Sequence, residues 1–266
     1  MLAAARRQFL SEYGAVRASE GRGSDEAAWY RELPFCTSVG ALASQWKIRA
    51  RSWDYLYRHI LPGFVRNIGT PLRILDLGAG NCWMSWRLAE LGHGPVAVDI
   101  FQDARDGLLA SRHYTTLTPF SVVEAEFDNL PLADRSFDLA IFNASFHYSA
   151  DYVRTLAETF RVLQPSGAAI IMDTPVYGTP EQGSRMVEER KQRYRERFGF
   201  PSDAQQSAEF LDRTTLAGLA RQLKIRWAIH RPWYGWKWHS RPISAWLRGK
   251  RQPSRFWILV GERDRA

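Results

Sequence analysis

The sequence predicts an α/β protein built on a mostly parallel sheet of about seven strands with helices on both faces. Between residues 65 and 173, short apolar runs alternate with amphipathic stretches, a pattern typical of strand–helix–strand units. A glycine-rich turn follows the first of these runs, where such sheets open toward a ligand. The chain has 266 residues, 45% of them hydrophobic, which is enough for one sizeable core.

Each predicted element has a local reason in the sequence. Short apolar runs bounded by charged or turn-forming residues predict strands at 73–77, 96–100, 121–125, 137–143, 168–173, 225–229 and 256–260. Amphipathic stretches predict helices at 82–91, 103–112, 151–163, 181–197 and 215–223. The third of these helices is stopped by Gln-Pro-Ser-Gly at 164–167.

The flanks of the alternating region differ from it in composition. Residues 1–64 carry spaced aromatic and charged residues with weak helical periodicity, which predicts a helical N-terminal cap. Residues 65–266 are expected to form the main domain, with insertions at about 174–212 and 231–254. The second insertion is rich in aromatic and basic residues, and between Lys224 and Arg255 the chain has nine Lys or Arg residues and no acid.

Bulk composition restricts the partners and the cellular location. A net charge of +8 attracts phosphates, anionic substrates or an acidic membrane surface without choosing among them. The two cysteines lie far apart and the histidines lack ligand spacing, so no metal site is predicted. No apolar stretch approaches the ~20 residues of a membrane span, and the first residues lack the order of a secretory signal. We therefore expect a cytoplasmic protein, whose oligomeric state the sequence does not define.

A glycine-rich loop follows the first predicted strand. In residues 74–82 an apolar strand leads into Gly78-Ala79-Gly80 and then into a helix start. Glycines let the backbone approach a ligand closely, and free N–H groups at a helix start act as donors. Asp99 ends the next predicted strand, close to the ~20-residue spacing at which a carboxylate binds a ribose diol. The loop and Asp99 together predict a nucleotide site.

Two details favour S-adenosylmethionine over a nicotinamide dinucleotide at this site. A dinucleotide fingerprint places a third glycine three positions after Gly80, where this chain has Trp83, whose indole would obstruct a pyrophosphate. Asp76, two residues before Gly78, would repel a pyrophosphate but suits the ammonium group of a methionine. S-adenosylmethionine carries that ammonium group and no phosphate.

Over residues 72–173 the chain resembles the class I S-adenosylmethionine-dependent methyltransferases, in particular the branch that includes ubiquinone and menaquinone C-methyltransferases. The resemblance extends beyond the glycine loop to three further motifs in the same order. They are Glu126-Phe127-Asp128-Asn129-Leu130-Pro131-Leu132, Ser136-Phe137-Asp138 and Arg161-Val162-Leu163-Gln164-Pro165-Ser166-Gly167. The resemblance implies a Rossmann-like sheet, a methyltransferase enzyme and S-adenosylmethionine as the cofactor.

The resemblance also implies how the cofactor is held. Glu126 stands where the family's carboxylate accepts from the adenine amino group, with the Phe127 N–H beside the ring, and Asp128 takes that place if the register slips. The chain departs from the family at Glu126, where Asp is usual, and at Cys82, where a third glycine is usual. The residues predicted to bind the cofactor are Asp76, Gly78, Ala79, Gly80, Asn81, Asp99, Ile100, Glu126, Phe127 and Asn143.

The chemistry of methyl transfer limits what a catalytic residue has to do. Displacement at a sulfonium needs alignment more than a catalytic dyad, although an alcohol or phenol acceptor benefits from a general base. The candidate base is His147, which follows the fourth strand, where such sheets place ligands; the alternative is a histidine that hydrogen-bonds the loop. We therefore predict O-methylation of a small-molecule acceptor. The residues predicted to contact that acceptor are Tyr148, Tyr177, Trp233 and Tyr234.

Other functions remain open at this point. Methylation of RNA or another anionic polymer would use the positive charge, but residues 143–146 lack the Asn-Pro-Pro-Tyr signature of base-amino methyltransferases, so nucleic acid is the less favoured partner. A non-catalytic cofactor-binding or scaffold protein would retain only the sheet. The aromatic and basic segment 231–254 has four interpretations: a packing layer over the sheet edge, a wall of the acceptor pocket, a peripheral membrane contact or a nucleic-acid surface.

Overall fold

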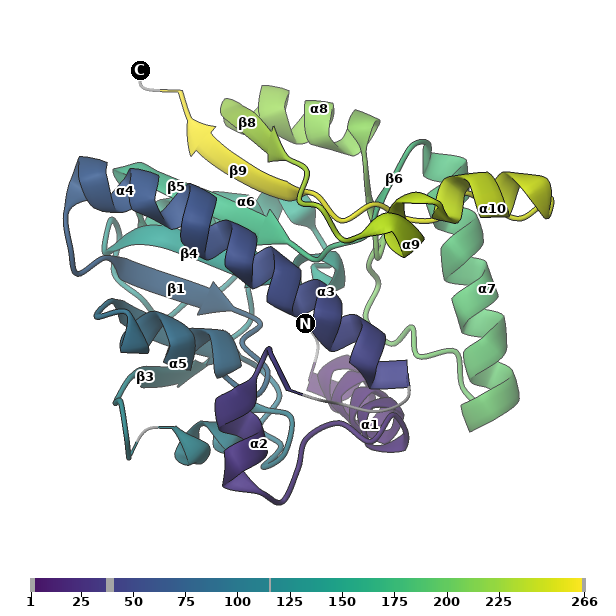
Figure 1. Ribbon diagram of the computed structural model, residues 1–266, viewed down its shortest axis with the longest axis horizontal. Coiled ribbons are helices and arrows are strands. Elements are labelled where there is room, and N and C mark those ends of the chain that lie inside the picture. The colour runs from purple at the N-terminus through teal and green to yellow at the C-terminus, as the bar shows by residue number, and fades with distance from the viewer. Residues whose placement is uncertain (1–2, 37–40, 115, 265–266) are drawn as a thin grey trace.

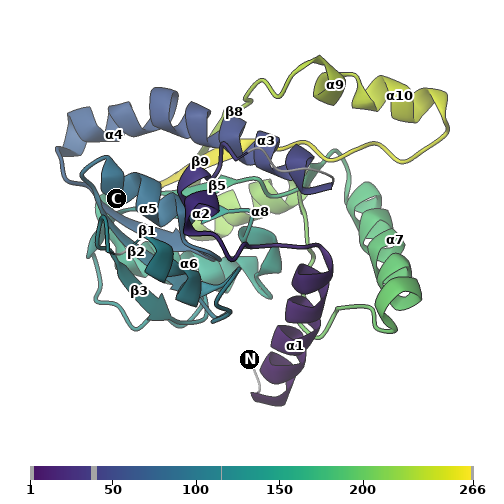
Figure 2. The ribbon, with the colours of Figure 1, turned by 60° about the horizontal axis from the view of Figure 1, so that its bottom comes forward.

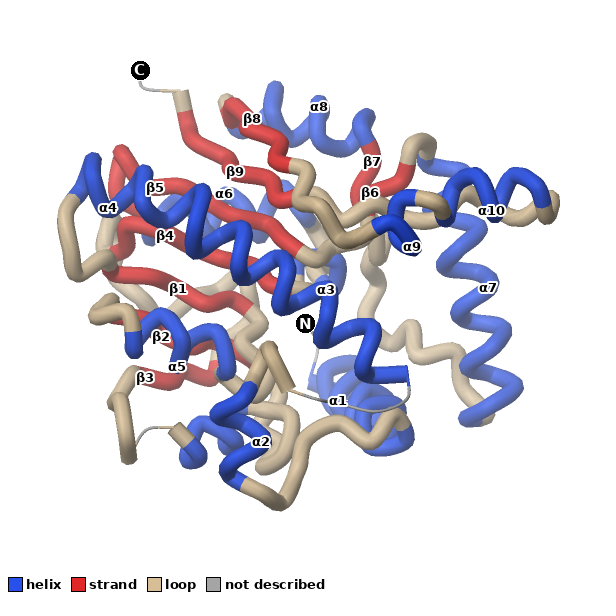
Figure 3. The backbone as a smooth tube through the Cα atoms, viewed as in Figure 1, coloured by secondary structure: helices blue, strands red, loops and turns tan. Residues whose placement is uncertain are grey.

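The computed structural model describes residues 3–36, 41–114 and 116–264. Its centre is a seven-stranded sheet in the order β3-β2-β1-β4-β5-β9-β8, in which β9 runs antiparallel to both of its neighbours (Figures 1 and 3). The strands are β1 (Arg73–Leu77), β2 (Gly94–Asp99), β3 (Ser121–Glu124), β4 (Phe137–Asn143), β5 (Leu163–Met172), β8 (Ile225–His230) and β9 (Ile258–Arg263). The mostly parallel, Rossmann-like sheet predicted from the sequence is confirmed.

Two hydrophobic layers form the core, one on each face of the sheet. Because side chains alternate along a strand, Leu139 and Ile141 of β4 belong to one layer, and Ala140 and Phe142 belong to the other. The helices that cover the sheet are α3 (Ala41–Tyr55), η1 (Leu56–Ile60), α4 (Leu61–Ile68), α5 (Trp83–Glu90), α6 (Tyr152–Val162) and α8 (Arg213–Leu223). In Figure 1, α3, α4 and α5 lie in front of the sheet, and α6 and α8 lie behind it.

The segment that precedes β1 is helical, as its periodicity predicts. Two shorter helices, α1 (Ala3–Ser19) and α2 (Ala27–Glu32), come before the rod formed by α3, η1 and α4. In this rod η1 is a π-helical stretch, and helical structure continues to Ile68. Figure 2 shows α1 standing apart from this rod, and its contacts are made with loops at the carboxyl ends of the strands.

The predicted and observed elements differ where local turns compete with regular structure. Strands β1 and β4 have the predicted bounds, but the predicted α-helix at 103–112 is wrong, because turns there lead into a 3₁₀-helix, η2 (Leu108–His113). The Asp103 carboxylate accepts the backbone N–H groups of Arg105 and Asp106, which stabilises the turn instead. Strand β5 begins at Leu163, five residues before the predicted start, because the chain continues in extended conformation directly from α6.

In the C-terminal half of the chain, two segments, here called excursions, leave the sheet and return to it. The first contains the charged helix α7 (Pro180–Phe198) and a two-stranded sheet of β6 (Val176–Tyr177) and β7 (Leu211–Asp212). The second, between β8 and β9, carries α9 (Trp236–His239) and α10 (Arg241–Leu247), which the sequence did not predict. In the part of the chain that the structure describes, no helix has both the length and the apolar character to cross a membrane.

Candidate active site

The glycine loop joins β1 to α5 at the point where the strand order reverses between β1 and β4. Gly78 and Gly80 have φ of +75° and +53°, a left-handed conformation that glycine adopts without strain. The N–H groups of Gly78 and Ala79 donate to the carbonyl of Val98 in β2, which fixes the loop over the sheet edge. Cys82 also has a positive φ of 63°, a left-handed conformation that favours glycine.

Asp99 lies at the end of β2, where its carboxylate is fixed by the backbone. Its Oδ2 accepts the N–H of Gly80 at 2.8 Å, and its Oδ1 accepts the N–H of Phe101 at 2.9 Å. Burial raises the pKa of the carboxyl group, and these N–H donors oppose that effect. Each oxygen keeps a further lone pair for a ligand hydroxyl, as the predicted ribose contact requires.

Asp76, in β1, is the most deeply buried carboxylate of the site. Its Oδ2 accepts the Ser85 hydroxyl at 2.7 Å, whereas its Oδ1 has no hydrogen-bond partner among the described residues. Burial raises the pKa of this carboxyl to about 7. A buried acceptor without a partner is costly, and a donor on a ligand, such as an ammonium group, would satisfy it.

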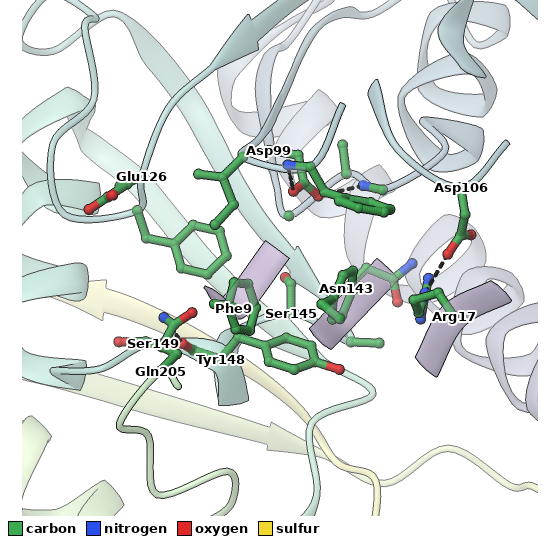
Figure 4. Close-up of a pocket in the computed structure, with 18 of the residues that line it drawn as sticks. Phe9, Arg17, Asp99, Asp106, Glu126, Asn143, Ser145, Tyr148, Ser149 and Gln205 are labelled. Carbon is green, nitrogen blue, oxygen red and sulfur yellow. Dashed lines mark hydrogen bonds and ion pairs between the residues drawn. The ribbon is translucent and has the colours of Figure 1, made fainter. Parts of the chain in front are cut away.

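A cavity of about 370 Å³ connects these groups. All ten residues predicted to hold the cofactor line it, together with Tyr148 from the predicted acceptor set. Figure 4 shows Asp99 on one side of this space and Tyr148 on the other, with Asn143 between them. Asn143 Oδ1 is a second buried acceptor without a partner in the described structure. The loop and strand ends therefore fit a nucleoside that carries an amino acid.

The part of the cavity that is predicted to hold the adenine lies after β3. Glu126 and Phe127 line the cavity, and the Phe127 ring packs edge-on against Phe142 at 5.5 Å between centroids. Asp128 lines the cavity too, but its carboxylate also pairs with Arg154 at 3.2 Å. Both carboxylates that the resemblance offers for the adenine, Glu126 and Asp128, therefore line the cavity.

One side of α1 forms a wall of the cavity that the sequence analysis missed. Phe9, Tyr13 and Arg17 line it at intervals of four residues, which is one face of a helix. Tyr13 packs edge-on against Phe101 and Tyr148, and Arg17 forms an ion pair with the buried Asp106. The stripe at helical spacing was the available signal, but any amphipathic helix shows such a stripe.

Three arginines line this outer part of the cavity, and their partners differ. Arg17 pairs with Asp106, and Arg22 pairs with Glu20, whereas Arg49 Nη1 is buried without a hydrogen-bond partner among the described residues. The Arg49 guanidinium lies 4.9 Å from the ring centroid of Trp46, and this indole also lines the cavity.

His147 is placed just beyond the cavity rather than in its wall. It lies in the short 3₁₀-helix η3 (Phe146–Tyr148), and its Nδ1 is buried without a partner in the described structure. Burial, with the nearby Arg49 and Arg17, lowers its pKa to about 4. His147 is therefore neutral at physiological pH and is a weak base.

The other predicted acceptor residues lie outside the cavity. Tyr177 is buried in β6 and accepts from Arg251 at 3.0 Å, and Trp233 is half exposed. Tyr234 joins a buried chain of hydrogen bonds, in which the Ser52 hydroxyl donates to Asp173 and lies 2.9 Å from the Tyr234 hydroxyl. This chain connects the segment after β8 to α3 and to the end of β5.

Comparisons with known proteins agree with this geometry. Residues 75–171 match a family model described as a methyltransferase domain. A malonyl-[acyl-carrier protein] O-methyltransferase from Erwinia pyrifoliae is 27% identical over 159 residues, which cover 54% of this chain and 55% of the relative. A demethylmenaquinone methyltransferase from Thermus thermophilus is 32% identical over 108 residues, covering 40% of this chain and 48% of the relative. The YcgJ protein from Bacillus subtilis has the same fold, with a TM-score of 0.57 at 13% identity over 78% of this chain and 100% of that chain.

The sheet order, the glycine loop and the family match define the class of this domain. The chain carries a class I S-adenosylmethionine-dependent methyltransferase domain, and S-adenosylmethionine is the cofactor of that domain. The chain spans about half the length of the curated relatives it matches.

Proposed function

We propose that this protein transfers the methyl group of S-adenosylmethionine to an anionic oxygen, of the carboxylate type, on a small-molecule acceptor. The observation that carries the proposal is Arg49, whose buried Nη1 lacks a partner in the described cavity wall. Burial and the neighbouring Arg22 and Arg17 lower its pKa to about 10, so the guanidinium stays charged at neutral pH. A buried donor of a charged group that makes no hydrogen bond is costly, and an anionic oxygen on the acceptor would accept from it.

The pKa of His147 supports a carboxylate rather than a phenol. Proton transfer from a phenol of pKa near ~10 to a group of pKa about 4 is strongly uphill, so His147 is a poor general base for it. A carboxylic acid, with a pKa near ~4, is already ionised at neutral pH and needs no base. The name of the Erwinia relative supports oxygen as the acceptor atom, since that protein is called an O-methyltransferase of a malonyl group.

Different residues of the cavity would hold different parts of the cofactor and so align its methyl group with the acceptor. S-adenosylmethionine supplies an activated methyl group on a sulfonium. Asp76 would hold the ammonium group, Asp99 the ribose hydroxyls, and Glu126 the adenine amino group. The aromatic rings of Phe9 and Tyr148 exclude water from the outer end, which leaves an acceptor carboxylate less solvated and more nucleophilic.

The substitution Arg49→Gln tests the acceptor assignment. We expect the KM for a carboxylate acceptor to rise at least about tenfold, because one charged hydrogen bond is lost, while the Kd for S-adenosylmethionine changes less than about twofold. Arg51→Gln, on the exposed side of the same helix, is the matched control. A weakened Kd with an unchanged KM would assign Arg49 to the methionine carboxylate and overturn the acceptor proposal.

Two further measurements separate the alternatives. Calorimetry with S-adenosylmethionine should show binding that Asp99→Ala weakens, whereas a scaffold without a cofactor would show no heat. Methyl transfer from a deuterium-labelled cofactor into a cell extract, followed by mass spectrometry, should give labelled esters of small carboxylic acids. Labelled RNA, with turnover that falls steeply with salt, would replace the small-molecule proposal.

A further inference from the structure

The second excursion from the sheet, here called the arm, consists of residues 231–255. It leaves β8 and returns to β9, two strands that are antiparallel neighbours, with His230 paired to Ile258. Figure 2 shows α9 and α10 of the arm extending away from the sheet, near α7. Nothing in the proposed methyl-transfer site uses the exposed side of α9 and α10, so their surface needs its own explanation.

The arm exposes an unusual concentration of large apolar side chains. Of the thirteen large hydrophobic side chains that are exposed among the described residues, five lie in this segment. They are Trp233, Trp236, Ile243, Trp246 and Leu247, with Trp236 83% and Trp246 73% exposed. Ile243, Trp246 and Leu247 are spaced three and four residues apart, so they share one face of α10. The surface of α9 and α10 is therefore not a packing layer over the sheet edge.

The same segment is strongly positive. The arm, residues 231–255, contains seven Lys or Arg residues and no acid, and Lys237, Arg248 and Lys250 are exposed beside the apolar side chains. The positive electrostatic potential of the arm therefore attracts an anionic surface.

Side-chain contacts hold the base of the arm against the body of the protein. The Tyr234 hydroxyl lies 2.9 Å from the Ser52 hydroxyl, and Arg251 donates to the Tyr177 hydroxyl at 3.0 Å. Arg251 also pairs with Glu189 of α7 at 3.1 Å. The arm is thus attached at several points, and its apolar side chains are presented on a supported element.

We propose that the arm docks on the surface of a bilayer that contains anionic lipids. Tryptophan rings and basic side chains are the residues that favour the headgroup region, and Ile243 and Leu247 suit the acyl boundary beneath it. Aliphatic side chains add nothing to base stacking, so a nucleic acid explains the surface less well. A second copy of this chain would bring an equally positive arm into a symmetric contact. The inference is independent of the proposed acceptor.

Vesicle binding by the full chain tests this proposal. We expect the protein to co-sediment with vesicles of phosphatidylcholine and phosphatidylglycerol in equal amounts, and at least about tenfold more weakly with phosphatidylcholine alone. Brominated acyl chains should quench tryptophan fluorescence in the bound state. The double substitution Trp236→Ser and Trp246→Ser should lower the affinity at least about tenfold and remove most of that quenching.

Matched variants control for composition and charge. Leu109→Ser with Leu117→Ser removes two exposed apolar side chains elsewhere and should leave binding unchanged. Arg248→Glu with Lys250→Glu should weaken binding to the anionic vesicles at least about tenfold, whereas Arg58→Glu with Arg66→Glu should have a much smaller effect. Unchanged melting temperatures would show that each variant is folded.

Three results would overturn the proposal. The first is vesicle binding that survives both tryptophan substitutions. The second is binding to single-stranded RNA that is lost in the tryptophan variant while vesicles fail to bind. The third is self-association by ultracentrifugation that this variant abolishes, again without vesicle binding.

Discussion

The side chain of Ser145 occupies the space that a Cβ atom on Gly78 would need. Ser145 is buried, and its hydroxyl donates to the carbonyl of Leu77 at 2.5 Å, so it cannot easily move aside. Gly78 also has a φ of +75°, a conformation in which an L side chain is strained. The contact joins the glycine loop after β1 to the segment after β4, the two sides of the cofactor crevice.

The substitution Gly78→Ala should therefore damage both the fold and the site. Steric overlap and backbone strain together should lower the free energy of unfolding by about 2–4 kcal/mol, and the Kd for S-adenosylmethionine should rise at least about tenfold. Denaturant unfolding and calorimetry measure the two effects. Gly92→Ala is the control, because Gly92 has a φ of +78° but nothing within 4 Å of its Cβ position. It should cost about 1–2 kcal/mol and leave cofactor affinity unchanged; equal effects of both substitutions would refute the steric account.

The raised pKa of Asp76 predicts opposite pH trends for stability and binding. The folded pKa is about 7 and the reference value is 3.8, so the folded state binds more protons between these values, and ligand-free stability falls as pH rises from about 4 to 7. Over the same interval, affinity for S-adenosylmethionine should rise, because the ionised carboxylate binds the ammonium group. Asp76→Asn should flatten both trends, as measured by urea unfolding and calorimetry from pH 5 to about 7.5. A slope that persists in this variant would assign the titration to another group.

The carboxylates after β3 should differ in their effect on adenine recognition. Glu126→Gln should weaken binding of S-adenosylhomocysteine about tenfold, whereas Asp128→Asn should change it less than about twofold, because Asp128 already pairs with Arg154. An analogue with oxygen in place of the adenine amino group gives the sharper measurement. Wild type should discriminate against it, and Glu126→Gln should not. The reverse ranking of the two variants would show that the alternative register, with Asp128 at the adenine, is correct.

His147 should contribute little to the rate with a carboxylate acceptor. General-base catalysis is worth about 10²–10⁴ in rate, so loss of a true base would lower kcat by that factor. For His147→Asn we expect less than about a tenfold change in kcat, and at saturating S-adenosylmethionine this kcat should not vary between pH 6 and about 9, because the acceptor is ionised throughout. A decrease of a hundredfold or more would restore His147 as the base and argue for an alcohol or phenol acceptor.

Sequence reasoning was strongest where function depends on local backbone chemistry. The positions of four residues at the sheet edge could be predicted from local sequence patterns. A turn that needs positive φ indicates Gly78 and Gly80, and carboxylates in or at the end of a strand indicate Asp76 and Asp99. Parallel strands then bring their carboxyl ends together. The wall formed by Tyr13 and its neighbours could not be predicted, because the packing partners of α1 are distant in sequence.

The same limit applies to the polar groups near the acceptor end. The hydrogen-bond chain Tyr234–Ser52–Asp173 joins three segments that no spacing rule connects, and only folding brings them together. The role proposed for Arg49 could not be predicted either, because the lack of a hydrogen-bond partner for its Nη1 among the described residues depends on the folded structure. The role of a charged side chain at a site can be inferred only when the groups around it are known.

The position of β9 has a consequence for how the protein is made. Within the sheet β8 pairs with β9 alone, and β9 also covers the edge of β5. A nascent chain that ends before residue 258 therefore exposes the edge of β5 and leaves β8 without a neighbour, although every residue predicted to hold the cofactor has already been synthesised. Protection from proteases should therefore arrive in one late step, when residues 258–263 become free to pair on release from the ribosome, rather than gradually as the parallel strands form.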